Sequence, residues 1–194
     1  MTPAQITRIQ TKIIKLRKVL AAERGRYGGY DDNAGWRYTI LNLYVSIADY
    51  KGASVYLRWF FKNFPDDAGF PFFWVEACMT YFYNKKLDQA RSMAFNAFAA
   101  NPHTWEVFFT GTATEVPGIK PNSNWEGVEL ALQLPYRADQ EQYAQFATWL
   151  QTCLAEPKMQ DLIQTYFDLK LKLSTTPVGP LRNSLVEQLY GLKI

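Results

Sequence analysis

Few residues of this 194-residue chain have side chains suited to catalysis or metal binding. There is one histidine, His103, and there are two cysteines, Cys78 and Cys153. Histidine is the usual acid-base group near neutral pH, and thiolates act as nucleophiles or metal ligands. His103 follows Pro102 in a predicted turn, where we expect it to face solvent or to lie beside a helix cap. Both cysteines lie in apolar helical segments, so core packing explains them better than reactivity.

The acidic residues offer two further candidates. Glu126 and Glu129 are three residues apart, a spacing that places them on one helix face as an acid-base pair or as a solvated pair. Residues 31–33 (Asp, Asp, Asn) could bind calcium, but they directly precede a predicted helix and suit its N-terminal cap better. Because the histidine and cysteines are scattered, the sequence predicts no catalytic residue, no metal site and no cofactor.

The first 26 residues predict an amphipathic helix that carries most of the positive charge. Thr2, Pro3 and Gln5 form a typical capped start. Residues 1–26 sum to +6, against +3 for the whole chain. Opposite the apolar stripe lies a candidate basic patch, which consists of Arg8, Lys12, Lys15 and Lys18. A solvated capping helix explains this patch. The alternatives are contact with an acidic protein, with nucleic acid or with an anionic membrane surface.

Residues 34–102 contain one helical pattern twice, at a spacing of 37 residues. The matched pairs are Tyr44 with Tyr81, Ala53 with Ala90, and Pro65 with Pro102. Small residues let two antiparallel helices approach closely, and proline after the second helix ends it. Asp66 or Asp67 is expected to cap the helix that begins the second copy. The pattern therefore predicts two stacked helical hairpins.

The spacing of these residues resembles the tetratricopeptide repeat (TPR) family. The second copy has an aromatic residue, a small residue, a tyrosine, two alanines and a closing proline in the family's order: Trp74, Cys78, Tyr81, Ala90, Ala97 and Pro102. The first copy matches less well, because Trp36 lies one residue early and Leu41 replaces the small residue. The resemblance implies an all-α, right-handed superhelical stack of antiparallel hairpins, with an N-terminal capping helix and additional C-terminal helices.

The resemblance also implies a surface for binding a partner, because the first helix of each TPR unit lines a concave face. The corresponding positions are Tyr38, Asn42, Val45, Phe72, Val75, Glu76, Met79, Phe82 and Tyr83. Asn42 matches an asparagine that often binds a peptide backbone in this family. This aromatic and Met-rich set favours an apolar peptide or partner surface. The alternative is that C-terminal helices fill the concave face and use these side chains as core.

The sequence thus favours a non-catalytic scaffold or adaptor that binds another protein of unknown identity. One alternative is a dedicated inhibitor, such as an immunity protein that neutralises a toxin. The other is a nucleic-acid-binding regulator that uses the basic patch.

We expect one helical domain over residues 1–194. After 34–102 come further helices over 103–174, with a loop at 115–124, and a terminal helix at 181–192. Residues 125–134 predict one of these helices. No stretch reaches the ~20 apolar residues that a membrane span needs. No secretory leader is evident, and the two isolated cysteines suit a reducing compartment, so a cytoplasmic location is expected.

Overall fold

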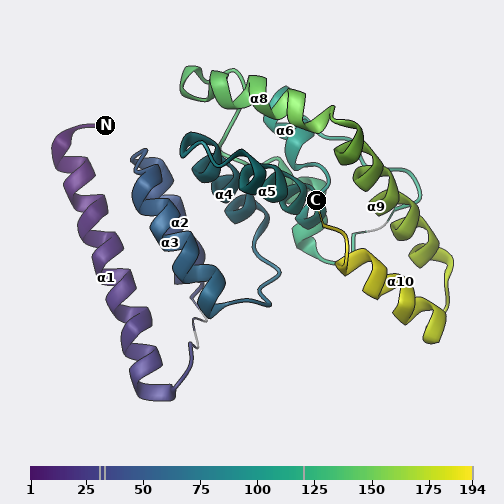
Figure 1. Cartoon of the computed structure of the whole chain (residues 1–194), viewed down its shortest axis with the longest axis horizontal. Coiled ribbons are helices and arrows are strands. Elements are labelled where there is room, and N and C mark those ends of the chain that lie inside the picture. The colour runs from purple at the N-terminus through teal and green to yellow at the C-terminus, as the bar shows by residue number, and fades with distance from the viewer. Residues whose placement is uncertain (31, 33, 120, 194) are drawn as a thin grey trace. The chain divides into compact units, whose positions relative to one another are not determined.

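The computed structural model describes residues 1–30, 32, 34–119 and 121–193 of the chain. Every regular element in this part is helical, and none of the described residues lies in a β-strand, which confirms the all-α class. The elements are α1 (Pro3–Tyr27), α2 (Trp36–Ser46), α3 (Tyr50–Asn63), α4 (Pro71–Tyr83), α5 (Leu87–Ala100), α6 (Thr104–Thr110), η1 (Asn124–Glu126), α7 (Val128–Ala131), η2 (Glu141–Tyr143), α8 (Ala144–Leu154), α9 (Pro157–Thr175) and α10 (Pro180–Tyr190) (Figure 1).

The chain divides into two compact units, Met1–Ala90 and Arg91–Ile194, and the boundary falls within α5. In the first unit α1 packs on α2, α2 packs on α3 and α4, and α3 packs on α4. In the second unit α8 packs on α9, and α9 forms a hairpin with α10 (Figure 1). Among the described residues, no helix has both the length and the apolar character needed to cross a membrane. The single domain expected from the sequence stays a prediction.

Helix α1 begins and ends as its sequence predicts. The backbone N–H of Gln5 donates to the Thr2 hydroxyl (3.3 Å), and the Thr2 N–H donates to the Gln5 side chain (2.7 Å), which completes the capping box. At the other end Gly28 adopts φ 72°, a left-handed conformation that glycine accepts without strain. The buried residues Ile13, Leu16 and Leu20 form the face that packs in the first unit.

The turns after α2 and α4 have the same backbone conformation, 37 residues apart. Ala48 and Lys85 are both left-handed, with φ 55° and 61°. The next residue in each turn donates its N–H back to the matched tyrosine carbonyl. Asp49 donates to Tyr44 over 3.0 Å, and Lys86 donates to Tyr81 over 2.9 Å. Non-glycine residues rarely adopt positive φ, so its recurrence at matched positions identifies the turn as a repeated local structure.

The ends of α3 and α5 repeat in the same register. Phe64 N–H donates to the Phe60 carbonyl (2.8 Å), as Asn101 N–H does to that of Ala97 (3.1 Å). Three residues later Asp67 donates to Phe64 (3.4 Å), as Thr104 does to Asn101 (3.1 Å). Pro65 follows Phe64, and Pro102 follows Asn101, as expected for residues that stop a helix. The 37-residue spacing is therefore a property of the backbone as well as of the side chains.

Small residues lie where the helices of each hairpin approach most closely. Ala53 and Ala90 are fully buried, and the Cys78 thiol donates to the Ala90 carbonyl over 3.2 Å. A Cβ atom at Gly52 would contact the Asp49 carboxylate and would lie 2.7 Å from the Tyr44 ring. The buried Ala53 and Ala90 are the repeated small positions, whereas the contacts at Gly52 belong to the first copy alone, where Gln89 is the matched residue of the second.

The aspartates before α2 and α4 have different roles. The Asp32 carboxylate accepts hydrogen bonds from the N–H groups of Trp36 (2.7 Å) and Arg37 (3.1 Å), so this residue caps the first turn of α2 as expected, although the N-cap position itself is Gly35. Asp31 and Asn33 lie outside the described residues. The prediction that Asp66 or Asp67 caps α4 is wrong, because the N-cap is Phe70 and no side chain caps it. Asp67 instead accepts from the Gly69 N–H (2.7 Å).

The helix predicted over 125–134 is shorter than expected. Only η1 and α7 form there, and Gly127 between them is extended (φ −77°, ψ 154°). The buried side-chain amide of Asn101 donates to the carbonyls of Trp125 (2.8 Å) and Gly127 (3.0 Å). The Trp125 carbonyl is thereby engaged by a side chain, whereas the Gly127 carbonyl also accepts from the Ala131 N–H (3.3 Å) at the start of α7. The bond to Trp125 gives a physical reason for the break before α7.

Candidate functional site

The predicted partner surface on α2 and α4 is partly buried. Five of its nine residues are buried, namely Val45, Val75, Glu76, Met79 and Phe82. Asn42 is exposed, and Tyr38, Phe72 and Tyr83 are partly exposed. These four residues recur at helical spacing along α2 and α4, which pack against each other in the first unit. We call them the α2/α4 surface.

Two members of the α2/α4 surface are bound to carboxylates of the same unit. The Asn42 side-chain amide donates to Glu76 Oε1 over 2.7 Å, and the Tyr38 hydroxyl donates to Asp67 Oδ1 over 2.5 Å. Glu76 itself is only 3% exposed. Tyr38 also packs against Phe73, with ring centroids 5.4 Å apart. These contacts fix the orientation of both side chains.

A partly buried ionic cluster contacts Tyr38. Arg37 contacts Asp32 Oδ2 (2.9 Å) and Asp67 Oδ2 (2.7 Å). Burial lowers the pKa of Arg37, but hydrogen bonds to Asp32, Tyr38 and Asp67 outweigh it, so its pKa is raised overall. Burial, with the neighbouring Asp67 carboxylate, raises the pKa of Tyr38 to about 12. Tyr38 therefore stays a neutral hydrogen-bond donor throughout the neutral range.

The basic patch on α1 is fully accessible. Arg8, Lys12, Lys15 and Lys18 are all exposed, and within the described part of the chain none of them has an ion pair. Two other arginines of α1 are used inside the first unit. Arg17 donates to the Tyr44 hydroxyl (3.4 Å), and Arg24 donates to Asn63 (3.0 Å). In helix α1, Arg17 and Arg24 thus contact side chains of the first unit, whereas the basic patch faces solvent.

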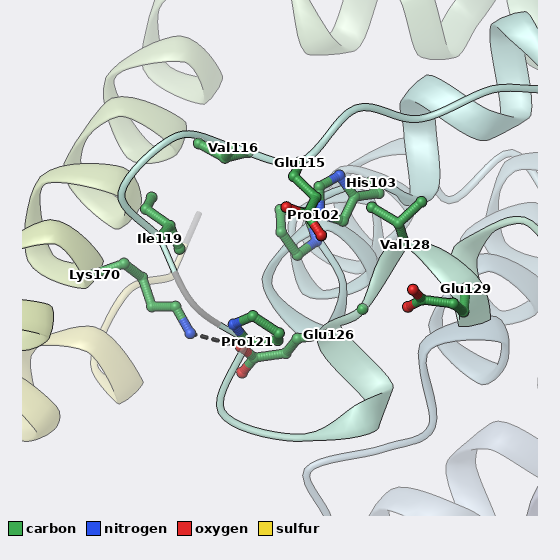
Figure 2. Close-up of a pocket in the computed structure, with 11 residues that line it drawn as sticks. Pro102, His103, Glu115, Val116, Ile119, Pro121, Glu126, Val128, Glu129 and Lys170 are labelled. Carbon is green, nitrogen blue, oxygen red and sulfur yellow. Dashed lines mark hydrogen bonds and ion pairs between the residues drawn. The ribbon is translucent and has the colours of Figure 1, made fainter.

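A cavity of about 240 Å³ lies in the second unit, beneath the segment from Glu115 to Ile119. We call it the α9 cavity because Lys170 of α9 forms one wall. Figure 2 shows side chains from the loop, from the start of α6 and from α7 around one space. The lining residues are Pro102, His103, Glu115, Val116, Ile119, Pro121, Glu126, Gly127, Val128, Glu129 and Lys170.

A buried ion pair forms the wall of the α9 cavity. Lys170 Nζ lies 2.6 Å from Glu126 Oε2, and the side chains of the two residues are 4% and 18% exposed. Glu126 Oε2 also accepts from the Asn122 N–H (2.9 Å). The ammonium lies 5.8 Å from the centre of the Tyr166 ring. Burial, together with the Glu126 carboxylate, raises the pKa of Tyr166.

His103 lies at the base of the α9 cavity and is 7% exposed, so the expectation that it faces solvent is wrong. The expectation of a place beside a helix cap is confirmed, because His103 is the N-cap residue of α6. Its backbone N–H donates to Asn101 Oδ1 over 2.9 Å. No hydrogen bond joins its imidazole to any other described residue. The imidazole therefore lies beside the space of the cavity without a partner from the described part of the chain, and its ring nitrogens are not enclosed.

The sequence indicated some residues of the α9 cavity but did not bring them together. Glu126 and Glu129 were expected on one helix face. They lie on either side of extended Gly127, and both line the cavity. Lys170 was missed, although a signal existed: it falls on the apolar stripe of α9 with Tyr166, Leu169 and Leu173. A lysine at such a position needs a buried counter-charge, but the sequence does not show that Glu126 supplies it.

The thiols and acidic groups form no further cluster in the described residues. Cys78 and Cys153 are buried and unpaired with each other. Within this part of the chain, no three His, Cys, Asp or Glu side chains converge as metal ligands would. Comparison of the chain with protein-family models, with curated proteins and with solved structures gives no match. What the chain does is therefore inferred from its own geometry.

Proposed function

We propose that this chain is a non-catalytic, TPR-like scaffold that binds another protein. The observation that carries the proposal is the 37-residue repeat of backbone conformation, with left-handed Ala48 and Lys85 at matched turns. Stacked copies of one helical hairpin serve in TPR proteins and other repeat proteins to present an extended binding surface. The packing of α2 on both α3 and α4 supports this architecture, because consecutive hairpins in such an array contact each other in that way.

The α2/α4 surface is the proposed binding face. Its accessible residues combine three aromatic rings with one amide, a composition typical of contacts that bind both apolar side chains and backbone groups. Tyr83 stacks on Tyr50 (ring centroids 4.3 Å apart), so its ring is already positioned. A short apolar segment of a partner, with one or two large side chains, fits this chemistry best.

A second candidate function is recognition of an acidic partner through α1. The specific observation that favours it is the exposure of all four cations of the basic patch without an ion pair in the described part of the chain. Such a patch steers anionic partners and gives salt-sensitive binding. An acidic protein and nucleic-acid phosphate are both possible partners for it.

The experiment begins with co-purification of the tagged protein and identification of its partner by mass spectrometry. Partner affinity is then measured for wild type, for Phe72→Ala and for Tyr83→Ala. A binding aromatic residue should cost about 2 kcal/mol or more of binding energy. Tyr27→Ala is the matched control, because Tyr27 is 64% exposed at the end of α1, outside the proposed face.

Charge reversal of Arg8, Lys12 and Lys15 to glutamate tests the second candidate. If only this triple variant weakens the complex, α1 binds the partner and the α2/α4 surface does not. Wild-type affinity in all of these variants would reject both surfaces. Circular dichroism of each variant establishes that the helices are intact before binding is compared.

A further inference from the structure

We propose that the α9 cavity binds an organic cation, namely an alkylammonium or guanidinium group of the kind found on lysine and arginine side chains and on small amines. This proposal does not depend on the α2/α4 surface, because every residue that lines the cavity belongs to the second unit. It is carried by the charge of the cavity, by His103 and by the apolar wall.

The charged side chains that line the α9 cavity are mostly acidic. Glu115, Glu126 and Glu129 contribute three carboxylates, whereas Lys170 is the one ammonium among the described lining residues. Lys170 is already neutralised by Glu126 at 2.6 Å. Glu115 and Glu129 are exposed, and no described side chain forms an ion pair with them. Among the described residues, the unpaired charge at the opening is therefore negative, and it attracts a cation.

His103 provides an independent indication of a ligand. Its side chain lines the α9 cavity, it is 7% exposed, and its imidazole has no hydrogen-bond partner among the described residues. The ring nitrogens are not among the buried polar atoms that lack a partner, so the imidazole is open to a hydrogen bond from a group inside the cavity. A neutral imidazole has one acceptor nitrogen, which can receive an N–H from an ammonium or guanidinium group.

The rest of the wall suits the alkyl part of such a cation. The apolar lining residues are Val116, Ile119, Val128, Pro102 and Pro121. Figure 2 shows Val116 and Ile119 together on the loop side of the space. The volume of about 240 Å³ is far above the ~10–15 Å³ that one water molecule needs. A chain of four carbon atoms with a charged end therefore fits both the size and the chemistry of the cavity.

The test uses the fact that His103 is the only histidine of the chain. In protein prepared without a histidine tag, the imidazole C–H signals in a proton–carbon NMR spectrum belong to this residue alone. We expect n-butylammonium and n-propylguanidinium to shift these signals in a saturable way. Two compounds of similar length are the controls: n-butanol, which is neutral, and pentanoate, which is anionic. Neither should shift the signals to a comparable extent at equal concentration.

Variants at the opening then connect binding to charge. The double variant Glu115→Gln/Glu129→Gln should weaken n-butylammonium binding about tenfold or more, because hydrogen bonds to charged groups are lost. Both residues are exposed, so the fold should be retained. The control is Glu187→Gln, which removes an exposed carboxylate of α10 in the same unit but outside the cavity. It should leave the affinity unchanged.

Several outcomes would overturn the proposal. Equal shifts with n-butanol would indicate a merely apolar cavity, stronger shifts with pentanoate would indicate an anion site at Lys170, and no shift with either cation would remove the site. If the cation binds, acetyl-Gly-Lys-Gly-amide distinguishes the two sources. Binding at least as tight as that of n-butylammonium indicates a basic side chain of a partner, and weaker binding indicates a free amine. Loss of partner binding in the α2/α4 variants would leave this result unaffected.

Discussion

The side-chain amide of Asn42 donates a hydrogen bond to the carboxylate of Glu76, and the two atoms are 2.7 Å apart. Asn42 lies on α2 and is exposed, whereas Glu76 lies on α4 and is 3% exposed. The bond therefore joins the first helices of the two hairpins and provides a buried carboxylate with a neutral donor. A residue that the sequence suggested for peptide binding thus also stabilises the scaffold.

Two substitutions of Asn42 test this stabilising role. Asn42→Ala removes a donor from a buried carboxylate and should lower the free energy of unfolding by about 1.5–3 kcal/mol. Asn42→Asp should lower the free energy of unfolding further at pH 7, because it places two carboxylates together. The difference between the two variants should shrink at pH 4, because protonation removes the repulsion. Urea unfolding at both pH values measures these effects. Asn183→Asp, at an exposed position of α10, should change stability by less than about 0.5 kcal/mol.

Glycine-to-alanine substitutions should have opposite signs in α3 and α1. Alanine is normally the better helix former by about 1 kcal/mol. At Gly52 the new Cβ would meet the Asp49 carboxylate and would lie 2.7 Å from the Tyr44 ring, so Gly52→Ala should destabilise the protein. At Gly25 nothing lies within 4 Å of a Cβ, so Gly25→Ala should stabilise it by up to about 1 kcal/mol. Thermal unfolding of both variants gives the comparison.

Equal stabilisation by the two substitutions would contradict the close approach of α2 and α3 at Gly52.

The parts of the fold that the sequence predicted are those set by local rules. The capping box of Thr2 and Gln5, the apolar stripe of α1 and the helix stops at Pro65 and Pro102 each depend on residues a few positions apart. Local rules failed at residues 125–134, where the side-chain amide of Asn101, more than twenty residues away, donates to the carbonyls of Trp125 and Gly127 on either side of the break. The helical periodicity of the sequence could not show that a distant side chain would bind these carbonyls.

The candidate sites were harder to predict because burial and pairing are tertiary properties. The pattern could indicate that Val75 and Met79 lie on one face of α4, but it could not show that both are fully buried. In the same way Lys170 could be recognised as unusual on an apolar stripe, whereas its pairing with Glu126 depends on how the segment before α7 folds over α9. The α9 cavity could not be predicted for the same reason.

Cys153 should be unreactive in the folded protein at moderately alkaline pH. Burial, and to a lesser degree the Glu156 carboxylate, raises the pKa of the Cys153 thiol from 9.0 to about 11. Burial disfavours the thiolate in the folded protein. The contribution of Cys153 to the free energy of unfolding is therefore fully present below pH 9 and is lost as the pH rises through about 11. We expect no modification of native protein by iodoacetamide at a pH near 8.5, and modification of both cysteines in urea. Rapid modification of native Cys153, located by mass spectrometry, would contradict its burial.

The ion pair between Lys170 and Glu126 should behave as a coupled unit. Glu126→Gln leaves the ammonium of Lys170, whose side chain is 4% exposed, without its carboxylate and should cost about 3 kcal/mol of unfolding free energy. Lys170→Met should cost less, because Glu126 is more exposed and keeps the hydrogen bond from the Asn122 N–H. The double variant should cost less than the sum of the two single variants, since it removes both buried charges together.

The partly exposed ion pair of Arg91 and Glu156 is the control for this cycle. Its shortest N–O distance, 2.8 Å, is close to that of the buried pair, but its side chains are 27% and 35% exposed. Glu156→Gln should therefore cost less than Glu126→Gln, since water reaches both charges of this pair and screens them in part. Urea unfolding of all variants at one pH gives the coupling energy. Additive effects at Lys170 and Glu126, or an equal cost at Glu156, would mean that the wall of the α9 cavity is solvated and that its ion pair is not buried.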